Sequence, residues 1–254
     1  MELKDQIVLV TGASRGLGAE IAKAFGREGA KVVVNYYKSE EKAQQVVETI
    51  GQDSAIAIQA DVRNQDEVEN MFALAANHFG KPIITIVNNA LINFSFDAVN
   101  KKDASTISWE DYQTQFEGSV KAALHTVQAG RKAMSDINFG RIVNIGTNLF
   151  QRPVVAYHDY NTSKAALLGF TRNMAQELGK NGITVNMVSG GLLQTTDASS
   201  ATSDEVFQII KENTPLQKVT TPEDVADSIL FFASPWSRAV TGQNLVVDGG
   251  LVMN

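Results

Sequence analysis

The chain has 254 residues, of which 44% are apolar and 20% are charged, and its formal net charge is -6 at pH 7. This composition is that of an ordinary globular protein, and the acidic balance gives no general attraction to nucleic acid or to anionic membranes. Cysteine is absent and the histidines (His78, His125 and His158) lack metal-ligand spacing, so we expect no metal site; because no membrane helix or signal peptide is evident either, we expect a cytoplasmic protein.

Short β-branched runs alternate with longer helical patterns along the chain. The runs are almost wholly apolar, as expected for strands that helices cover on both faces. They predict strands at Ile7–Thr11, Lys31–Tyr36, Ser54–Ala60, Ile83–Asn88, Arg141–Ile145, Ile183–Val188 and Asn244–Val247. The helical patterns lie at Gly16–Glu28, Glu40–Ile50, Gln65–Phe79, Trp109–Ala133 and Tyr157–Gly179. This alternation predicts an α/β fold, a doubly wound parallel sheet of Rossmann type with about seven strands and helices on both faces.

No linker, compositional break or internal repeat divides the chain, which predicts a single domain over residues 1–254. Two segments interrupt the alternation, the polar Leu91–Ser108 and the Gly-, Ser- and Thr-rich Ser189–Asp204. Both follow strand ends, where ligands bind in open α/β sheets, and loops of this length are usually functional or mobile. We predict that residues 189–204 form a lid over the substrate.

A glycine-rich turn follows the first strand and opens the first helix. Three glycines let the backbone turn sharply and approach a pyrophosphate, which N–H groups at the helix start would hold. The predicted dinucleotide contacts in this turn are Gly12, Ser14, Arg15, Gly16, Leu17 and Gly18. The same turn satisfies Gly-x-Ser-x-Gly, the nucleophile elbow of serine hydrolases, with Ser14 as the nucleophile. This alternative is weaker because the serine follows the first strand and no histidine falls in a convincing late strand-end loop.

Tyr160 and Lys164 lie four residues apart in a predicted helix, a spacing that places two side chains on one face. An ammonium group beside a phenol favours the phenolate. Together with a bound cationic nicotinamide, Lys164 would lower the pKa of the tyrosine from about 10 toward the range that acid catalysis requires. Taken alone, two residues at this spacing are more often an ordinary exposed helix pair, and it is the rest of the chain that favours the catalytic interpretation.

Several motifs in order resemble the classical branch of the short-chain dehydrogenase/reductase family, along essentially the whole chain. Within the family, the likeness is greatest to the 3-oxoacyl-acyl-carrier-protein reductases. The motifs are Thr11–Gly18, Asp61-Val62, Asn88-Asn89-Ala90, Tyr160-x-x-x-Lys164, Gly191 with Thr195, and Asp248-Gly249-Gly250. The resemblance implies that Tyr160 protonates a carbonyl oxygen, that Lys164 holds the nicotinamide ribose, and that Thr147 stands where the family has a serine. It also implies cofactor contacts from Asp61, Val62, Asn88, Ala90, Gly191 and Thr195.

The chain departs from the family pattern at three further positions. Leu91 replaces the glycine after Asn-Asn-Ala, Gly190 replaces the proline before Gly191, and Ser119 replaces the asparagine of the proton relay. Because serine is shorter, a relay water would have to shift or a second water enter. These departures motivate a second alternative, a non-catalytic NADPH-binding protein.

The end of the second strand bears on the choice of cofactor. Enzymes that select NAD usually place an acidic residue there, but this strand ends at Asn35-Tyr36 with no acid until Glu40. Arg15, Lys38 and Ser39 could instead surround a 2′-phosphate, which suits the planar charge of arginine. The prediction is NADPH, with Asn35, Lys38 and Ser39 among its contacts.

The predicted reaction is reduction of a ketone to an alcohol, with a 3-oxoacyl thioester as the expected substrate. Docking of an acyl carrier protein is a weaker expectation, because the family's arginines align with Asn138 and Gln176. The patterns Trp109–Ala133 and Tyr157–Gly179 carry more apolar and small residues than two sheet-facing stripes need. In the family the equivalent helices pack against their copies, so the resemblance implies a homotetramer.

Overall fold

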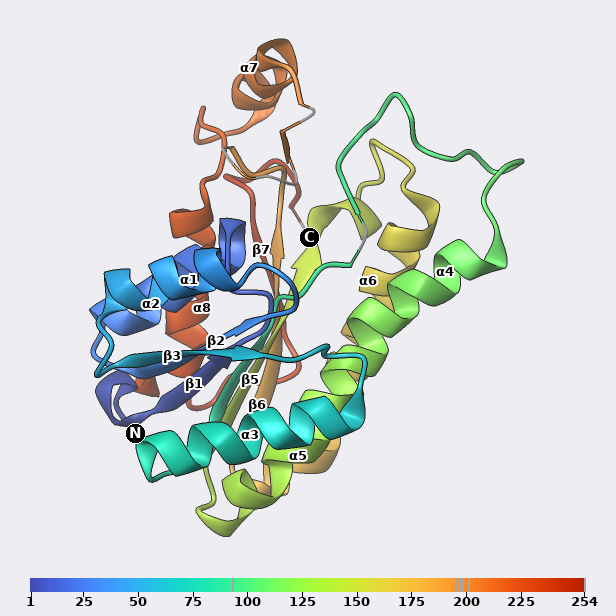
Figure 1. Ribbon diagram of the computed structural model, residues 1–254. Helices are drawn as coiled ribbons and strands as arrows, with labels where there is room; N and C mark the ends of the chain where they lie inside the picture. The colour runs from blue at the N-terminus through green and yellow to red at the C-terminus, as the bar shows by residue number, and fades with distance from the viewer. Residues whose placement is uncertain (93, 195, 197–198, 201, 254) are drawn as a thin grey trace.

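The computed structural model describes residues 1–92, 94–194, 196, 199–200 and 202–253. In this part of the chain, seven parallel strands form one sheet in the order β3-β2-β1-β4-β5-β6-β7, which confirms the predicted fold class (Figure 1). The strands are β1 Ile7–Val10, β2 Lys31–Tyr36, β3 Ala55–Gln59, β4 Thr85–Asn88, β5 Gly140–Thr147, β6 Ile183–Gly190 and β7 Asn244–Val247. The helices are α1 Gly16–Arg27, α2 Glu40–Ile50, α3 Gln65–Phe79, α4 Trp109–Phe116, α5 Ala122–Asp136, α6 His158–Leu178, α7 Asp204–Asn213 and α8 Pro222–Ala233.

The two faces of the sheet are covered by different sets of helices (Figure 1). Successive side chains of β1 alternate between them: Val8 and Val10 pack with α1, α2 and α8, whereas Ile7 and Leu9 pack with α3, α5 and α6. Every residue of β1 is buried, as its continuous apolar run predicts for a central parallel strand. The two cores together fix the carboxyl ends of the strands, where the loops that carry polar residues begin.

The predicted helix Trp109–Ala133 is not continuous. α4 ends at Phe116, a π-helical turn spans Glu117–Lys121, and α5 begins at Ala122. Within the turn, Ser119 is buried and its Oγ lies 3.5 Å from Oγ of Ser163 in α6. Single π-helical turns are frequent at functional sites, and this one contains Ser119, the residue predicted to stand at a proton relay.

Other boundaries differ from the prediction for local reasons. β5 extends to Thr147, two residues beyond the predicted end, because its pairing with β6 continues to the carboxyl edge. The helices α7 and α8 were not predicted. Yet α8 has a clear start signal: Thr221 and Asp224 form a capping box, with Pro222 in the first turn.

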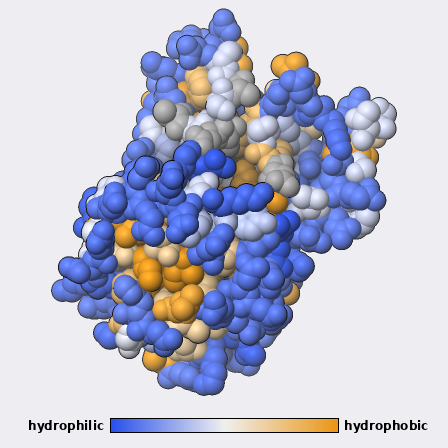
Figure 2. Space-filling model, in the orientation of Figure 1, coloured by the Kyte–Doolittle hydropathy of each residue, from blue (hydrophilic) through white to orange (hydrophobic). Residues whose placement is uncertain are grey.

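Most of the surface visible in Figure 2 is hydrophilic, and an apolar area lies over the region of β3 and α3. A shallow hollow there is lined by Ile56, Ala57 and Ile58 of the edge strand β3 and by Leu74 of α3, which is 45% exposed. None of the helices in the described residues is long and apolar enough to cross a membrane.

Candidate active site

A cleft with a volume of about 580 Å³ lies over the carboxyl ends of the strands. Strand order reverses between β1 and β4, the place where doubly wound sheets bind ligands. Most of the predicted cofactor residues line this cleft: Gly12, Ser14, Arg15, Gly16, Leu17, Gly18, Asn35, Lys38, Ser39, Asp61, Val62, Ala90, Tyr160, Lys164 and Gly191. Asn88 lies beneath it, and Thr195 lies outside the described residues.

The glycine-rich turn is held from below by Asn35. The Gly12 N–H donates to Asn35 Oδ1 at 3.1 Å, and Asn35 Nδ2 donates to the Ala60 carbonyl at 3.1 Å. Asn35 is 2% exposed, so its main role is to position the turn, not to contact a ligand. This neutral residue thus occupies the strand end where an acid would select NAD, and it is committed to the backbone.

The same turn leaves no room for side chains at two of its glycines. Gly12 has a φ of 63°, and a Cβ there would lie 2.9 Å from Ala90 Cα. A Cβ at Gly18 would collide with the Gly12 carbonyl oxygen and lie 2.5 Å from Nδ2 of Asn89. Thr11 fixes the turn to the segment after β4, because its Oγ1 accepts hydrogen bonds from the backbone N–H groups of Asn89 and Ala90 at 2.9 and 3.0 Å.

The start of α1 suits an anionic ligand. In the described structure no side chain caps this helix at Arg15, so its first N–H groups face the cleft. A tight glycine backbone that has no room for a Cβ at Gly12 and Gly18, next to N–H groups that no side chain caps, fits the pyrophosphate of a dinucleotide. The residues present therefore fit a nicotinamide cofactor.

A cluster of cations surrounds Tyr37 at the ends of β2 and β3. The Tyr37 side chain is exposed, and its ring centroid lies 5.2 Å from Lys38 Nζ and 6.0 Å from Arg63 Cζ. Arg63 also forms a two-point ion pair with Asp61, with Nη2–Oδ2 at 2.6 Å and Nε–Oδ1 at 3.0 Å, which lowers the pKa of Asp61. The sequence prediction missed Arg63 and Tyr37, although Arg63 directly follows Asp61-Val62.

β5 and α6 bring the predicted catalytic residues together. Thr147 ends β5, and hydrogen bonding to Thr147 opposes the large rise that burial causes in the pKa of Tyr160. Lys164 Nζ donates to the Ile145 carbonyl at 2.8 Å, and burial lowers the pKa of Lys164 to about 8. Tyr160 and Lys164 are 4% and 3% exposed.

The expected lowering of the pKa of Tyr160 by Lys164 is not a property of the protein by itself. Lys164 Nζ lies 5.7 Å from the Tyr160 ring centroid and is directed to a backbone carbonyl. Desolvation dominates, so the phenol stays protonated at neutral pH. A protonated phenol is the form that a general acid needs.

The amino-acid sequence of this chain is similar to those of known proteins. A family model described as enoyl-(acyl carrier protein) reductase matches residues 12–252. The 3-oxoacyl-[acyl-carrier-protein] reductase of Synechocystis sp. is 36% identical over 254 residues, 99% of this chain and 98% of that one. The enzyme of the same name from Staphylococcus aureus is 35% identical, over 96% of this chain and 97% of that one. The enzyme from Vibrio cholerae is 31% identical, over 100% of both chains. The chain belongs to the short-chain dehydrogenase/reductase family.

Solved structures agree with this assignment. A protein described as a gluconate dehydrogenase of Agrobacterium tumefaciens superposes with a TM-score of 0.89 at 28% identity, over 99% of this chain and 98% of that one. A protein described as a short-chain alcohol dehydrogenase of Sinorhizobium meliloti superposes with a TM-score of 0.87 at 29% identity, over 98% of this chain and 97% of that one. The chain is thus an oxidoreductase of the short-chain dehydrogenase/reductase family, and the family implies a nicotinamide cofactor.

Beneath the cleft of this family member, a buried amide network fixes Asn88. Asn88 Nδ2 donates to Asn144 Oδ1 at 2.8 Å, and Asn88 Oδ1 accepts from Thr126 Oγ1 at 2.7 Å. Asn144 in turn donates to Thr171 Oγ1 at 2.9 Å. The network joins β4, α5, β5 and α6, so it holds the strand ends that carry the site at a fixed spacing.

An aromatic cluster covers the general-acid candidate. The Phe94 ring stacks on the Tyr160 ring with centroids 4.3 Å apart and an interplanar angle of 14°. Phe96 meets the Tyr160 ring edge-on at 5.6 Å, and Tyr157 packs edge-on against both phenylalanines. The sequence prediction missed these rings, and the signal was a Phe-x-Phe pair inside an otherwise polar loop.

The geometry does not favour the serine hydrolase alternative. His125 Nδ1 lies 3.1 Å from the Val62 carbonyl oxygen, and His78 packs edge-on against Phe79. His158 begins α6, beyond β5 in the chain. Neither of these two contacts directs a histidine at Ser14, and no histidine is among the described residues that line the cleft with Ser14.

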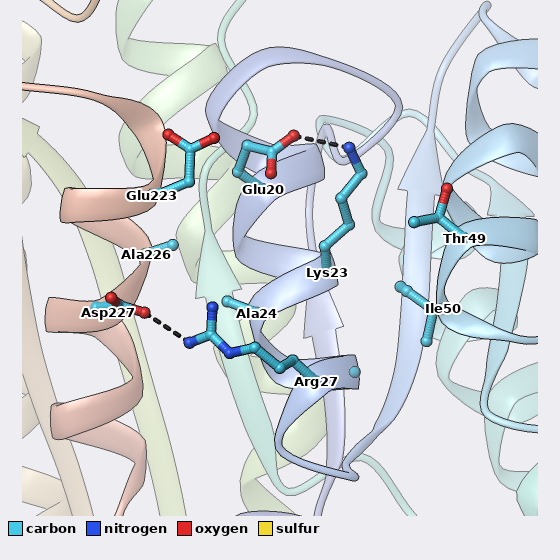
Figure 3. Close-up of a pocket in the computed structure, with 10 residues that line it drawn as sticks. Glu20, Lys23, Ala24, Arg27, Thr49, Ile50, Glu223, Ala226 and Asp227 are labelled. Atoms are coloured by element: carbon cyan, nitrogen blue, oxygen red, sulfur yellow. Dashed lines mark hydrogen bonds and ion pairs between the residues drawn. The ribbon is translucent and has the colours of Figure 1, made fainter.

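A second hollow of about 310 Å³ lies between α1, α2 and α8 (Figure 3). Four of its charged side chains form two short ion pairs, Lys23 with Glu20 and Arg27 with Asp227, both at 2.7 Å. The described lining holds no histidine, serine or cysteine, and its one hydroxyl group, that of Thr49, donates to the Gln45 carbonyl. It is therefore not a candidate for the chemistry.

Lys164 makes one consequence of burial measurable. Its folded pKa of about 8 lies below the ordinary value of 10.5, so between these pH values the unfolded chain binds more protons and the free energy of unfolding rises with pH. Lys164→Met removes this contribution. At each pH, the free energy of unfolding of the wild type is subtracted from that of Lys164→Met. We expect this difference to fall by about 2 kcal/mol from pH 7 to pH 9.5, because only the wild type gains stability over this range.

Urea unfolding at the two pH values measures this difference, and because Tyr160 is present in both proteins its own titration enters both free energies of unfolding. An equal difference at pH 7 and pH 9.5 would show that Lys164 keeps an ordinary pKa in the fold.

Proposed function

We propose that this chain is an NADPH-dependent reductase that converts a ketone, a 3-oxoacyl thioester, to the alcohol. The observation that carries the proposal is that Tyr160 and Lys164 line the cleft that also contains the glycine-rich turn, with Thr147 in hydrogen-bonding reach of Tyr160. The names of the relatives, 3-oxoacyl-[acyl-carrier-protein] reductases, support the substrate class.

In this proposal a bound NADPH supplies the hydride that the carbonyl carbon receives. Tyr160 donates its phenolic proton to the carbonyl oxygen, and Thr147 donates a second hydrogen bond to the same oxygen. The ammonium of Lys164 holds the ribose and stabilises the phenolate that Tyr160 becomes. Ser119 Oγ lies 3.5 Å from Ser163 Oγ, which in turn donates to the backbone carbonyl of Tyr160 at 2.9 Å. A proton relay from Ser119 to the Tyr160 hydroxyl would run through water.

The preference for NADPH rests on the charges at the adenosine end of the cleft. Arg15, Lys38 and Ser39 line that end, together with Arg63, and no carboxylate stands at the Asn35 position. An arginine that contacts a phosphate contributes about 1.5–3 kcal/mol, so Arg15→Ala should raise the KM for NADPH by about 10- to 150-fold and leave the KM for NADH nearly unchanged.

Initial rates with NADPH and NADH, using acetoacetyl-CoA, test the proposal. We expect a higher kcat/KM for NADPH. The matched control is Arg238→Ala, an exposed arginine that does not line the cleft and whose Nη1 donates to the Pro235 carbonyl. A preference for NADH by the wild-type protein would reject the cofactor assignment. Turnover of other ketones without turnover of acetoacetyl-CoA would reject the substrate assignment.

Three further expectations stay predictions. Residues 189–204 are proposed as the substrate lid of one domain spanning 1–254. Docking of an acyl carrier protein would use the exposed cations Arg131, Lys132 and Arg172. A homotetramer built through the helices of residues 109–136 and 158–178 follows from the family resemblance, and light scattering of the purified protein measures it.

A non-catalytic dinucleotide-binding protein is the second candidate. The observation that favours it is the Phe94 ring stacked on Tyr160, which leaves the phenol 4% exposed. Tight NADPH binding without turnover on a broad panel of ketones would favour this candidate over the reductase.

A further inference from the structure

The two ends of the cleft differ in chemistry. The charged lining residues Arg15, Lys38, Asp61 and Arg63 follow β1, β2 and β3, at the end with the glycine-rich turn. The other lining side chains are largely apolar, Leu91, Ile92, Phe94, Phe96, Ile145 and Leu193, with the hydroxyl groups of Thr196 and Ser199. Of these, Phe94 and Phe96 contact the Tyr160 ring. The charge of Lys164, which lies below Tyr160, is directed to the Ile145 carbonyl. A group bound beside Tyr160 therefore meets the rings of Phe94 and Phe96.

Part of this apolar wall is aromatic and in direct contact with Tyr160. Phe94 lies face to face with the Tyr160 ring, Phe96 lies edge-on to it, and the two phenylalanine rings meet edge-on at 5.1 Å. A carbonyl oxygen that accepts a hydrogen bond from the Tyr160 hydroxyl brings the substituents of its carbon next to these rings. Flat apolar groups gain about 0.5–1.5 kcal/mol per aromatic contact beyond the area they bury, which corresponds to roughly 2- to 12-fold in affinity.

We infer that Phe94 and Phe96 determine substrate specificity, and that the preferred substrate carries a flat apolar group, such as a phenyl ring, on the carbonyl carbon. This inference rests on the proposed function and narrows it: among 3-oxo thioesters, an aryl ketone is favoured over a straight-chain ketone of equal size. The position of the rings on Tyr160 makes this selection act at the reacting carbonyl.

Two thioesters of N-acetylcysteamine with the same number of acyl carbons test the inference, 3-oxo-3-phenylpropanoyl and 3-oxononanoyl. We expect the wild-type protein with NADPH to reduce the phenyl compound with a kcat/KM at least about five-fold higher. Phe94→Leu keeps an apolar side chain but removes the flat ring, so the ratio should fall to within about two-fold of one. Phe231→Leu, on α8, replaces a partly exposed phenylalanine away from the cleft lining and should keep the wild-type ratio.

A wild-type ratio of one or less would overturn the inference while leaving the proposed reductase intact. An equal loss of both activities in Phe94→Leu, with the ratio unchanged, would also overturn it, because the ring would then only support the fold. Reduction of neither thioester, nor of acetoacetyl-CoA, would contradict the proposed function and the inference with it.

Discussion

Tyr160→Phe is expected to lower kcat for ketone reduction by about 10²- to 10⁴-fold, the usual contribution of a positioned general acid. The change removes one hydroxyl group from a side chain that is buried under Phe94, so the ring packing is retained. Cofactor binding should stay within about two-fold of the wild type, because the turn and the start of α1 are untouched. Steady-state rates and a fluorescence titration with NADPH measure the two quantities separately.

Tyr112→Phe is the matched control for this experiment. Tyr112 stacks on Trp109 in α4 at 6.2 Å and lies outside the cleft lining. It should keep wild-type rates. A Tyr160→Phe protein that reduces ketones at more than about a tenth of the wild-type rate would show that another group donates the proton.

Gly18→Ala is expected to weaken NADPH binding by at least about 100-fold. The added Cβ would collide with the Gly12 carbonyl oxygen and crowd the Asn89 side chain, which holds the turn to the end of β4. Backbone has little freedom to yield here, so the turn must distort and lose the cradle for the pyrophosphate. Calorimetric titration with NADPH measures the loss.

The control is Gly179→Ala. Gly179 has a φ of -56°, and nothing lies within 4 Å of a Cβ built on it. Its substitution should leave binding unchanged and stabilise the fold by up to about 1 kcal/mol. Wild-type affinity in a folded Gly18→Ala protein would show that the ligand does not rest on this turn.

The parts of the site that the sequence predicted are those set by short-range spacing. Gly12 to Gly18 follow a strand directly, and Tyr160 and Lys164 share one face of a helix. Their relative positions are therefore set by local secondary structure and do not depend on the tertiary fold. The apolar strands were also predictable, since burial on both faces leaves a continuous apolar run.

What could not be predicted depends on contacts between distant segments. Phe94 and Tyr160 are 66 positions apart, and their stacking depends on the path of a long loop that has no periodic pattern. Asn35 holds Gly12, and Lys164 binds the Ile145 carbonyl. These two contacts also join residues far apart in the chain, so they could be identified only from the folded backbone. The helical spacing of Tyr160 and Lys164 indicated proximity but not that burial would dominate the pKa of the tyrosine.

The most direct test of the central claim is transfer of deuterium from NADPH labelled at C4 of the nicotinamide to acetoacetyl-CoA. The account predicts a 3-hydroxybutyryl product with deuterium on carbon 3 when the transferred C4 position carries the label, and a proton from solvent on its oxygen. Tyr160→Phe should bind the labelled cofactor but form little of this product. Intact NADPH and unchanged ketone in the presence of saturated wild-type protein, across acetoacetyl-CoA and both nine-carbon thioesters, would contradict the claim that this chain is a reductase of 3-oxoacyl thioesters.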